Sequence, residues 1–349
     1  MGSAAGGYNE SNVTRLSLMQ PKLSNPARFL LMKTSSLGDV LHNLAVVSDL
    51  RRVFPGAAVD WCVEAPFAEI PAWHTGVRRV IPVAIRRWRK SLFNADTWAE
   101  IRLALSALRS EHYDAIIDTQ GLVRSVLLAQ LAHGPVYGQN RHEAREALSG
   151  LLVTHPLNVP YSLHAVDRYR MIAATALGYA DRLPSLPLDF GLDDRFPRQP
   201  GNEVFLFTNT SRDKKLWPEG DWINVGRQLR SVGLVPVFTA GNEIEAARSQ
   251  RIAAGIAEGD TLGEILFRPT LTQLTERLSK ARLCLGVDTG FTHIACALEI
   301  PTIAIFTDTD PALAGGFGLG QRATFGHLDT IPPVADVVGQ LRTWGVLPA

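Results

Sequence analysis

The stretch Val287-Asp288-Thr289-Gly290-Phe291-Thr292-His293 joins an apolar run to a series of small residues. The run before it, residues 282–287, is short and apolar, which is typical of a buried strand. Residues 294–298 after it continue as a helix. A strand that turns through Thr-Gly into a helix leaves backbone N–H groups at the helix start, and these suit a phosphate or diphosphate. An ordinary turn in which Asp288 or Thr289 caps the helix explains the pattern equally well.

The length and composition indicate a globular protein of two domains. A chain of 349 residues is too long for one simple core. Hydrophobic residues make up 46% and charged residues 20%, as in ordinary globular proteins. The net charge of +1 gives the whole chain no electrostatic reason to bind nucleic acid. No apolar run approaches the roughly 20 residues of a membrane-spanning helix.

The cysteines and the N-terminal segment indicate the compartment. Cys62, Cys284 and Cys296 form no Cys-x-x-Cys pair, which argues against a zinc site and a disulfide framework and favours a reducing compartment. Residues 1–26 are polar and lack the basic start and apolar middle of a signal peptide. We predict a disordered extension there.

The first domain is predicted to be a doubly wound α/β domain over residues 27–180. It opens with a strand at 28–32, a small polar loop at 33–39 and a helix at 40–53. Ligands of such sheets bind at the carboxyl ends of the strands. Further strands are predicted at 58–63, 79–83 and 113–118, and helices from 67 and over 96–109, 122–132 and 164–177.

A proline-containing stretch without periodicity, 181–202, is the predicted linker to a second α/β domain over 203–330. A terminal helix is predicted within 331–349. The two series of strands and helices together predict an α/β chain of two doubly wound, Rossmann-like domains that face a cleft. In the second domain, strands are predicted at 203–207, 235–239, 282–287 and 301–306, and helices at 222–232, 243–255, 271–280 and 294–298.

Two common phosphate-binding motifs are missing after the first strand. The loop there reads Lys-Thr-Ser-Ser-Leu-Gly, which is neither the dinucleotide fingerprint Gly-x-Gly-x-x-Gly nor the P-loop Gly-x-x-x-x-Gly-Lys-Ser/Thr. An NAD enzyme and a P-loop NTPase are therefore disfavoured, while another nucleotide-using enzyme of two domains stays possible.

Four segments in series resemble the ADP-heptose lipopolysaccharide heptosyltransferases, glycosyltransferase family 9. They are residues 33–42 (Lys-Thr-Ser-Ser-Leu-Gly-Asp-Val-Leu-His), 80–90, 210–218 and 288–293. The resemblance implies a GT-B fold and transfer of L-glycero-D-manno-heptose from ADP-heptose to the Kdo of Kdo-lipid A. It further implies inversion, no cofactor or obligatory metal, and a peripheral place on the cytoplasmic face of the inner membrane.

The resemblance implies that Asp39 is the catalytic base. Inverting transfer needs a group that takes the proton of the acceptor hydroxyl as the oxocarbenium-like centre forms. Asp39 follows a predicted strand and begins a predicted helix, so helix capping is its alternative role.

The resemblance also assigns the donor and acceptor contacts. The departing ADP needs its charge stabilised, and Lys215 matches the phosphate-binding lysine of the family, whereas Lys214 is expected to be solvated. Glu245 is the least distinctive match, and His293 fits a packing role as well as a ligand contact. The implied donor contacts are Thr210, Ser211, Lys215, Glu245, Asp288, Thr289, Gly290 and His293.

The basic segment 86–90 is expected to bind the anionic acceptor. Guanidinium groups suit phosphate and carboxylate, although a solvated loop or a contact with an anionic membrane is also consistent with the sequence. The predicted acceptor contacts are Ser36, Arg86, Arg87, Arg89, Lys90, Gln120 and Arg124.

One departure from the family and two alternative functions remain. Asp308 stands where the family has a glycine in the turn 307–311, so the backbone there could bend differently. The chain could instead add heptose to an already heptosylated core. A nucleotide-sugar epimerase or an inactive sugar-nucleotide binding module would use the same two-domain scaffold.

Overall fold

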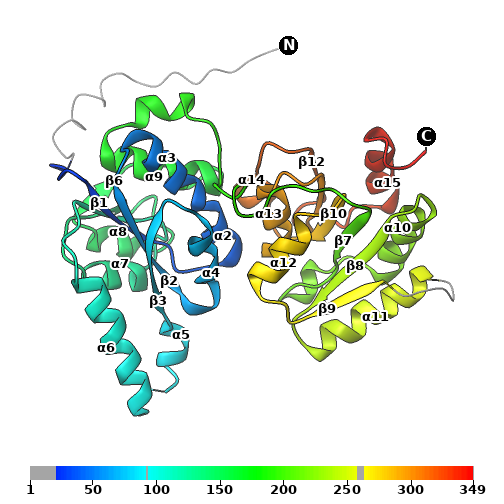
Figure 1. Cartoon of the computed structure of the whole chain (residues 1–349), viewed down its shortest axis with the longest axis horizontal. Helices are drawn as coiled ribbons and strands as arrows, with labels where there is room; N and C mark the ends of the chain where they lie inside the picture. The colour runs from blue at the N-terminus through cyan, green and yellow to red at the C-terminus, as the bar shows by residue number, and fades with distance from the viewer. Residues whose placement is uncertain (1–20, 92, 258–262, 349) are drawn as a thin grey trace.

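The computed structural model describes residues 21–91, 93–257 and 263–348. Most of the predicted N-terminal extension therefore lies outside the described residues. Two lobes lie side by side, one blue to green and one green to red (Figure 1). The chain crosses between them near residues 190–200, within the predicted linker.

The first lobe is built on a six-stranded parallel sheet with the order β3-β2-β1-β4-β5-β6. Its strands are β1 (Arg28–Met32), β2 (Ala58–Glu64), β3 (Val77–Val83), β4 (Ala115–Asp118), β5 (Val136–Gln139) and β6 (His155–Leu157). Its α-helices are α2 (Leu37–His42), α3 (Leu44–Val53), α4 (Glu69–Trp73), α5 (Ile85–Trp88), α6 (Ala95–Arg109), α7 (Val123–Ala129), α8 (Ala147–Leu152) and α9 (Ala165–Leu177).

The second lobe repeats this plan with the order β12-β11-β10-β7-β8-β9. Its strands are β7 (Glu203–Phe207), β8 (Val235–Ala240), β9 (Glu264–Phe267), β10 (Leu283–Val287), β11 (Thr302–Ile305) and β12 (Arg322–Phe325). Its α-helices are α10 (Glu219–Ser231), α11 (Glu243–Ala257), α12 (Leu271–Leu278), α13 (Gly290–Ala297), α14 (Pro311–Ala314) and α15 (Val334–Thr343). The prediction of two doubly wound α/β units is confirmed.

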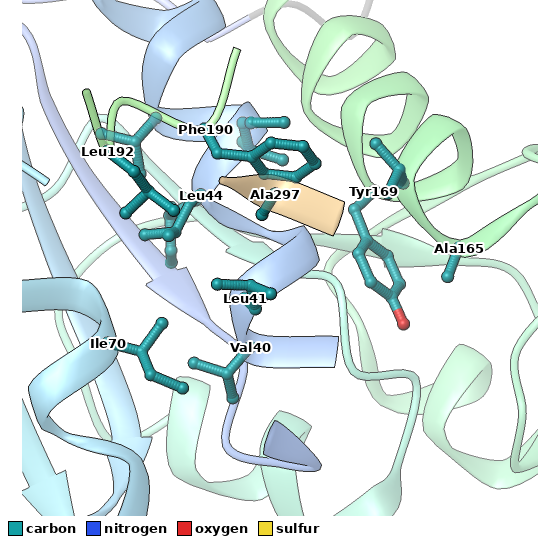
Figure 2. Packing of buried hydrophobic residues seen from close by; sticks show 14 of the residues in the cluster. Val40, Leu41, Leu44, Ile70, Ala165, Tyr169, Phe190, Leu192 and Ala297 are labelled. Carbon is teal, nitrogen blue, oxygen red and sulfur yellow. The ribbon is translucent and has the colours of Figure 1, made fainter. Parts of the chain in front are cut away.

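The core places the ends of the two central strands close to each other. Both β1 and β10 are buried along nearly their whole length, because their apolar side chains are covered on both faces of the sheet. One apolar cluster extends through both lobes, and Figure 2 shows Ala297 of α13 beside Leu44 of α3 and Phe190 of the linker. Two further clusters cover the outer faces of the sheets.

The two lobes meet directly at the starts of α2 and α13. A Cβ atom on Gly290 would lie 2.4 Å from Leu37 Cδ2, and one on Gly38 would lie 2.9 Å from His293 Cδ2. Only glycine leaves room for this approach, since real Cβ atoms keep a larger separation. The helix starts that follow β1 and β10 therefore face each other across the boundary between the lobes.

The helix predicted over 40–53 is instead two helices, α2 and α3, that meet at Asn43. The N–H group of Asn43 is shared between the carbonyl oxygens of Asp39 and Val40, both at 3.2 Å. Asparagine has a low helix propensity, which fits a break at this position. The side-chain oxygen and nitrogen of Asn43 are buried and have no partner among the described residues.

Four short strands, β5, β6, β9 and β12, and the short helices α5, α8 and α14 were not predicted from the sequence. Each of these strands has three or four residues, and three of them lie toward the sheet edges with partly exposed side chains. So few residues give too little periodicity to identify a strand. Neighbouring strands, rather than local sequence, determine these elements.

A buried ion pair within the first lobe is expected to contribute more to the free energy of unfolding than an exposed one. Arg170 of α9 donates to both carboxylate oxygens of Asp49 in α3, at 2.7 and 2.9 Å. Asp49→Ala leaves the guanidinium buried without its partner and should lower the free energy of unfolding by about 3 kcal/mol or more. Arg52→Ala removes the exposed pair with Asp189 and should cost less than about 1 kcal/mol. Urea denaturation of both variants checks this, and equal losses would contradict it.

Candidate functional site

A cavity of about 500 Å³ lies between the lobes. Its walls come from the loop after β1, helices α2 and α9, the loop after β7, the turn between β10 and α13, and the segment after β11. Carboxyl ends of parallel strands from both sheets therefore contribute to one site, as expected for doubly wound domains.

Asp39 lies in the first turn of α2 and lines this cavity. Its Oδ2 accepts hydrogen bonds from the backbone N–H (3.2 Å) and the hydroxyl (2.9 Å) of Ser36. Its Oδ1 accepts a hydrogen bond of 2.5 Å from the Tyr169 hydroxyl. Asp39 thus stabilises the start of the helix and also presents a carboxylate to the cavity.

The surroundings of Asp39 hold its carboxylate ionised. Burial alone would raise the pKa of Asp39, but the Lys33 ammonium and the Tyr169 hydrogen bond hold this pKa well below its usual range. Burial lowers the pKa of Lys33 to about 8. The Lys33 ammonium donates to the Thr119 carbonyl at 3.1 Å and lies 3.8 Å from the centre of the Tyr169 ring.

Asp288 anchors the opposite wall, at the end of β10. Its Oδ2 accepts hydrogen bonds from the Lys215 ammonium and, at 2.7 Å, from the Thr309 hydroxyl. His293 Nε2 lies 3.7 Å from the other carboxylate oxygen. Burial would raise the pKa of Asp288, but these neighbours lower it below its usual range. A cation and an anion, with side chains each 15% exposed, are therefore held together at the wall of the cavity.

The start of α13 has no side-chain cap. Thr289 occupies the N-cap position and its side chain makes no capping hydrogen bond. Thr289 and Gly290 both line the cavity. The alternative in which Thr289 caps the helix is therefore not realised, and the first N–H groups of α13 remain suitable donors for an anion.

The structure brings most of the predicted site residues to this one cavity. Ser36, Asp39 and Gln120 line it from the first lobe; Thr210, Ser211, Lys215, Asp288, Thr289, Gly290 and His293 line it from the second. Glu245 is placed elsewhere: its carboxylate accepts from the Gly241 N–H at 2.7 Å and from the Asn242 amide at 2.9 Å. It therefore closes the turn that precedes α11.

Gln120 and Arg124 position the loop that carries Ser36. The Gln120 side-chain oxygen accepts from the N–H groups of Thr34 and Ser35, both at 3.0 Å. Arg124 donates to the Ser35 hydroxyl at 3.2 Å without lining the cavity itself. Both residues tie the end of β4 and the following helix to the loop after β1.

The basic segment, residues 86–90, covers the end of α5 and the turn that follows it, outside the lining of the central cavity. The Arg87 guanidinium pairs with both carboxylate oxygens of Glu100 on α6, at 3.1 and 2.6 Å. Trp88 is buried and donates to the same carboxylate at 2.8 Å. Arg86, Arg89 and Lys90 are exposed beside it, so the cations available to a partner are these three.

Several cavity residues were not predicted from the sequence. Lys33 directly follows β1 and begins the segment 33–42 that resembles the family, so its place after a strand was a usable signal. Arg168 and Tyr169 lie inside α9, where buried positions look like ordinary helix core. Arg145 precedes the short helix α8, which carried no pattern, and Tyr161 lies in the loop between β6 and α9. The residues missed include Lys33, Gln139, Arg145, Tyr161, Arg168, Tyr169 and Thr309.

The turn with Asp308 has an ordinary backbone. Among the described residues, non-glycine positive φ angles occur at Arg268, Glu299 and Asp329 alone, so Asp308 needs no glycine-like conformation. Asp310 caps α14 by accepting from the Ala312 N–H at 2.8 Å. Within the described part of the chain, no group of three or more His, Cys, Asp or Glu side chains is placed to hold a metal ion.

Comparison with known proteins identifies the family. The model of glycosyltransferase family 9 (heptosyltransferase) matches residues 101–337. The chain belongs to this family. Lipopolysaccharide heptosyltransferase 1 of Escherichia coli K12 is 40% identical over 84% of this chain and 92% of its own length. The Pseudomonas aeruginosa protein of the same name is 40% identical over 91% of this chain and 88% of its own.

Solved structures of related heptosyltransferases have the same fold as this family 9 glycosyltransferase. E. coli heptosyltransferase WaaC with ADP superimposes with a TM-score of 0.81 at 37% identity, covering 90% of this chain and 99% of WaaC. WaaC with ADP-2-deoxy-2-fluoro heptose gives 0.79 at 35% identity, covering 91% of this chain and 99% of WaaC. The two facing sheets are therefore those of a GT-B glycosyltransferase, which confirms the predicted fold class.

Proposed function

We propose that this family 9 glycosyltransferase transfers L-glycero-D-manno-heptose from ADP-heptose to the Kdo of Kdo-lipid A. The observation that carries the proposal is one cavity lined by Asp39 from the first lobe and by Lys215 and Asp288 from the second. The WaaC structures with ADP and a fluorinated ADP-heptose support ADP-heptose as the donor. The relatives named lipopolysaccharide heptosyltransferase 1 support a lipopolysaccharide acceptor.

In the proposed reaction Asp39 accepts the proton of the acceptor hydroxyl. The acceptor oxygen forms a bond to the anomeric carbon of heptose while the bond from that carbon to the β-phosphate oxygen breaks. ADP leaves with the electron pair, and the anomeric configuration inverts because the acceptor attacks from the face opposite ADP. The neighbours of Asp39 keep its carboxylate ionised and therefore able to accept a proton, and by lowering its pKa they also make it a weaker base.

The second lobe is proposed to hold the donor. The Lys215 ammonium, the hydroxyls of Thr210 and Ser211, and the N–H groups of Thr289 and Gly290 would hold the diphosphate as its charge grows. Asp288 would orient the heptose, and His293 would support Asp288 from α13. Lys215 and Asp288 already contact each other, so donor binding exchanges part of this pair for phosphate and sugar contacts. Glu245 is proposed to contact the nucleotide beyond the cavity lining.

The first lobe is proposed to hold the acceptor. Arg86, Arg89 and Lys90, with Arg87 held by Glu100, supply cations for the phosphate and carboxylate groups of Kdo-lipid A. Nearer the base, Arg145 and Arg168 add guanidinium groups to the cavity itself. Ser36, Gln120 and Arg124 shape the loop beside Asp39.

The end of the first lobe that carries α5 and the start of α6 is proposed to contact the cytoplasmic face of the inner membrane. Phe93, Trp98 and Leu103 are exposed there near the cations of the basic segment, and Figure 1 places α5 and α6 at the lower tip of the molecule. Each cation near an anionic surface contributes about 1 kcal/mol. No described helix is long and apolar enough to span a bilayer.

Replacing the exposed cations should weaken acceptor use alone. The variant Arg86→Ala with Arg89→Ala is expected to raise the KM for Kdo-lipid A about 10-fold or more, because each lost charged contact weakens anion binding. The KM for ADP-heptose should stay within about twofold, since the donor lobe is untouched. Lys280→Ala, which removes an exposed cation of the second lobe, is the control. A defect confined to the donor would reject the acceptor role.

The proposed function is tested by ADP release from ADP-heptose with different acceptors. We expect release with Kdo-lipid A, and little release without an acceptor or with heptosylated Kdo-lipid A. Release with the heptosylated acceptor alone would assign the chain to a later step of core synthesis. Absence of acceptor-dependent release would instead indicate an epimerase or an inactive binding module.

A further inference from the structure

Tyr169 is the buried side chain that contacts Asp39 most closely. It lies on α9, is 2% exposed, and donates its hydroxyl hydrogen to Asp39 Oδ1 at 2.5 Å. Figure 2 shows its hydroxyl directed away from the neighbouring apolar side chains. The Lys33 ammonium, 3.8 Å from the ring centre, fixes the ring from one face by a cation–π contact. The phenol is therefore held in one orientation by contacts that do not involve a substrate.

The hydrogen bonds of Asp39 leave one acceptor position open. An ionised carboxylate offers about four lone-pair sites, two on each oxygen. The N–H and O–H groups of Ser36 occupy both sites of Oδ2. Tyr169 occupies one site of Oδ1. Among the described residues, no further donor to Asp39 is present, so the second lone pair of Oδ1, beside the Tyr169 hydroxyl, remains free.

We propose that Tyr169 is a positioning residue that fixes the rotation of the Asp39 carboxylate, so that the second lone pair of Oδ1 receives the acceptor proton. The inference rests on the proposed function. The acceptor O–H bond breaks, its proton moves to Oδ1, and its oxygen bonds to the anomeric carbon as ADP departs. Tyr169 keeps its own proton throughout and acts only through Asp39.

The hydrogen bond from Tyr169 has two possible effects on Asp39: it orients the carboxylate and it lowers the basicity of the carboxylate. These two effects change kcat in opposite directions. A donor to a carboxylate stabilises the charged form, and the Tyr169 hydroxyl lowers the pKa of Asp39. Its removal therefore makes Asp39 a stronger base, which by itself would favour proton transfer. A fall in kcat upon removal must then come from lost orientation, because the change in basicity acts in the opposite direction.

Tyr169→Phe tests the proposal, since it removes a single oxygen atom and keeps the ring. We expect kcat to fall about 10-fold or more, as small displacements of reacting groups are costly. The KM values for ADP-heptose and Kdo-lipid A should stay within about twofold. Tyr179→Phe is the matched control, because the buried Tyr179 hydroxyl lacks a partner among the described residues, and its kcat should equal that of the wild type.

The kcat of the double variant, with Tyr169→Phe and Asp39→Asn together, distinguishes a positioning role from a merely structural one. If Tyr169 acts through Asp39, Tyr169→Phe should not lower the residual rate of Asp39→Asn further. An unchanged kcat in Tyr169→Phe, a higher acceptor KM with kcat unchanged, or an undiminished loss in the double variant would overturn the inference. These results would leave the proposed function intact if the wild type forms product and Asp39→Asn forms it about 1,000-fold more slowly. A wild type that forms no heptosylated product would overturn both.

Discussion

Asp39→Asn is expected to lower kcat about 1,000-fold, because an amide of the same size cannot take the acceptor proton. The variant keeps the size of the side chain, but its single amide oxygen can accept from Ser36 or from Tyr169 and not from both, because the amide nitrogen only donates. The proposed donor contacts lie on the other lobe, so the dissociation constant for ADP-heptose should change less than about threefold. Steady-state ADP release and calorimetric titration with ADP-heptose measure the two quantities.

Asp194→Asn provides the control for loss of one carboxylate. Asp194 is exposed in the segment between the lobes, so its replacement should leave kcat and donor affinity unchanged. If Asp39→Asn keeps a kcat near that of the wild type, another group removes the proton. If it loses donor affinity together with kcat, Asp39 contributes to donor binding rather than to proton transfer.

Lys215→Met is expected to lower kcat about 100-fold and to weaken ADP-heptose binding. Its ammonium contacts Asp288 inside the cavity, and we propose that it contacts the diphosphate whose charge grows as the bond to the sugar breaks. Removing one such preorganised donor from an enclosed site typically costs about 100-fold to 1,000-fold in kcat. The variant also leaves Asp288 without its cation, which disfavours an anionic ligand further.

Lys214→Met is the matched control for this experiment. Lys214 is the preceding residue but its side chain is exposed and does not line the cavity. Its variant should retain kcat within about twofold of the wild type. Equal losses in the two variants would show that the general positive charge of the loop matters rather than the contact of Lys215 with the donor.

The fold was predictable from the sequence where apolar runs are long enough to show their period. The strands at 28–32, 203–207 and 283–287 and the helix at 165–177 meet this condition, and the structure contains them. Short strands such as β6 and β12 are determined by the neighbours they pair with. The break at Asn43 also depends on local hydrogen bonding that residue types alone do not reveal.

The candidate site was predictable where a polar residue directly follows a strand. Asp288 directly follows β10, whereas Asp39 lies in the first turn of α2 and Lys215 between β7 and α10; the family resemblance singled out these two, and the structure brings all three to one cavity. Tyr169 could not be found in this way, because its place inside α9 gives it the pattern of a core residue. Its relation to Asp39, 130 positions earlier in the chain, exists only after the first lobe has folded.

The site as a whole requires both lobes. The proposed base is on α2, whereas Lys215, Asp288 and the start of α13 lie on the other side of the boundary. Gly38 and Gly290 allow α2 and α13 to approach closely enough for both halves to line one cavity. Neither half holds both the proposed base and the proposed diphosphate contacts.

The central claim is that one base in the first lobe drives a single displacement at a donor held by the second. Proton NMR of the lipid formed from ADP-heptose and Kdo-lipid A tests it most directly. We expect one new heptose, bonded to Kdo, with an anomeric configuration opposite to that of the donor. Retention of the donor configuration, or ADP release without a new heptose–Kdo bond, would contradict the account.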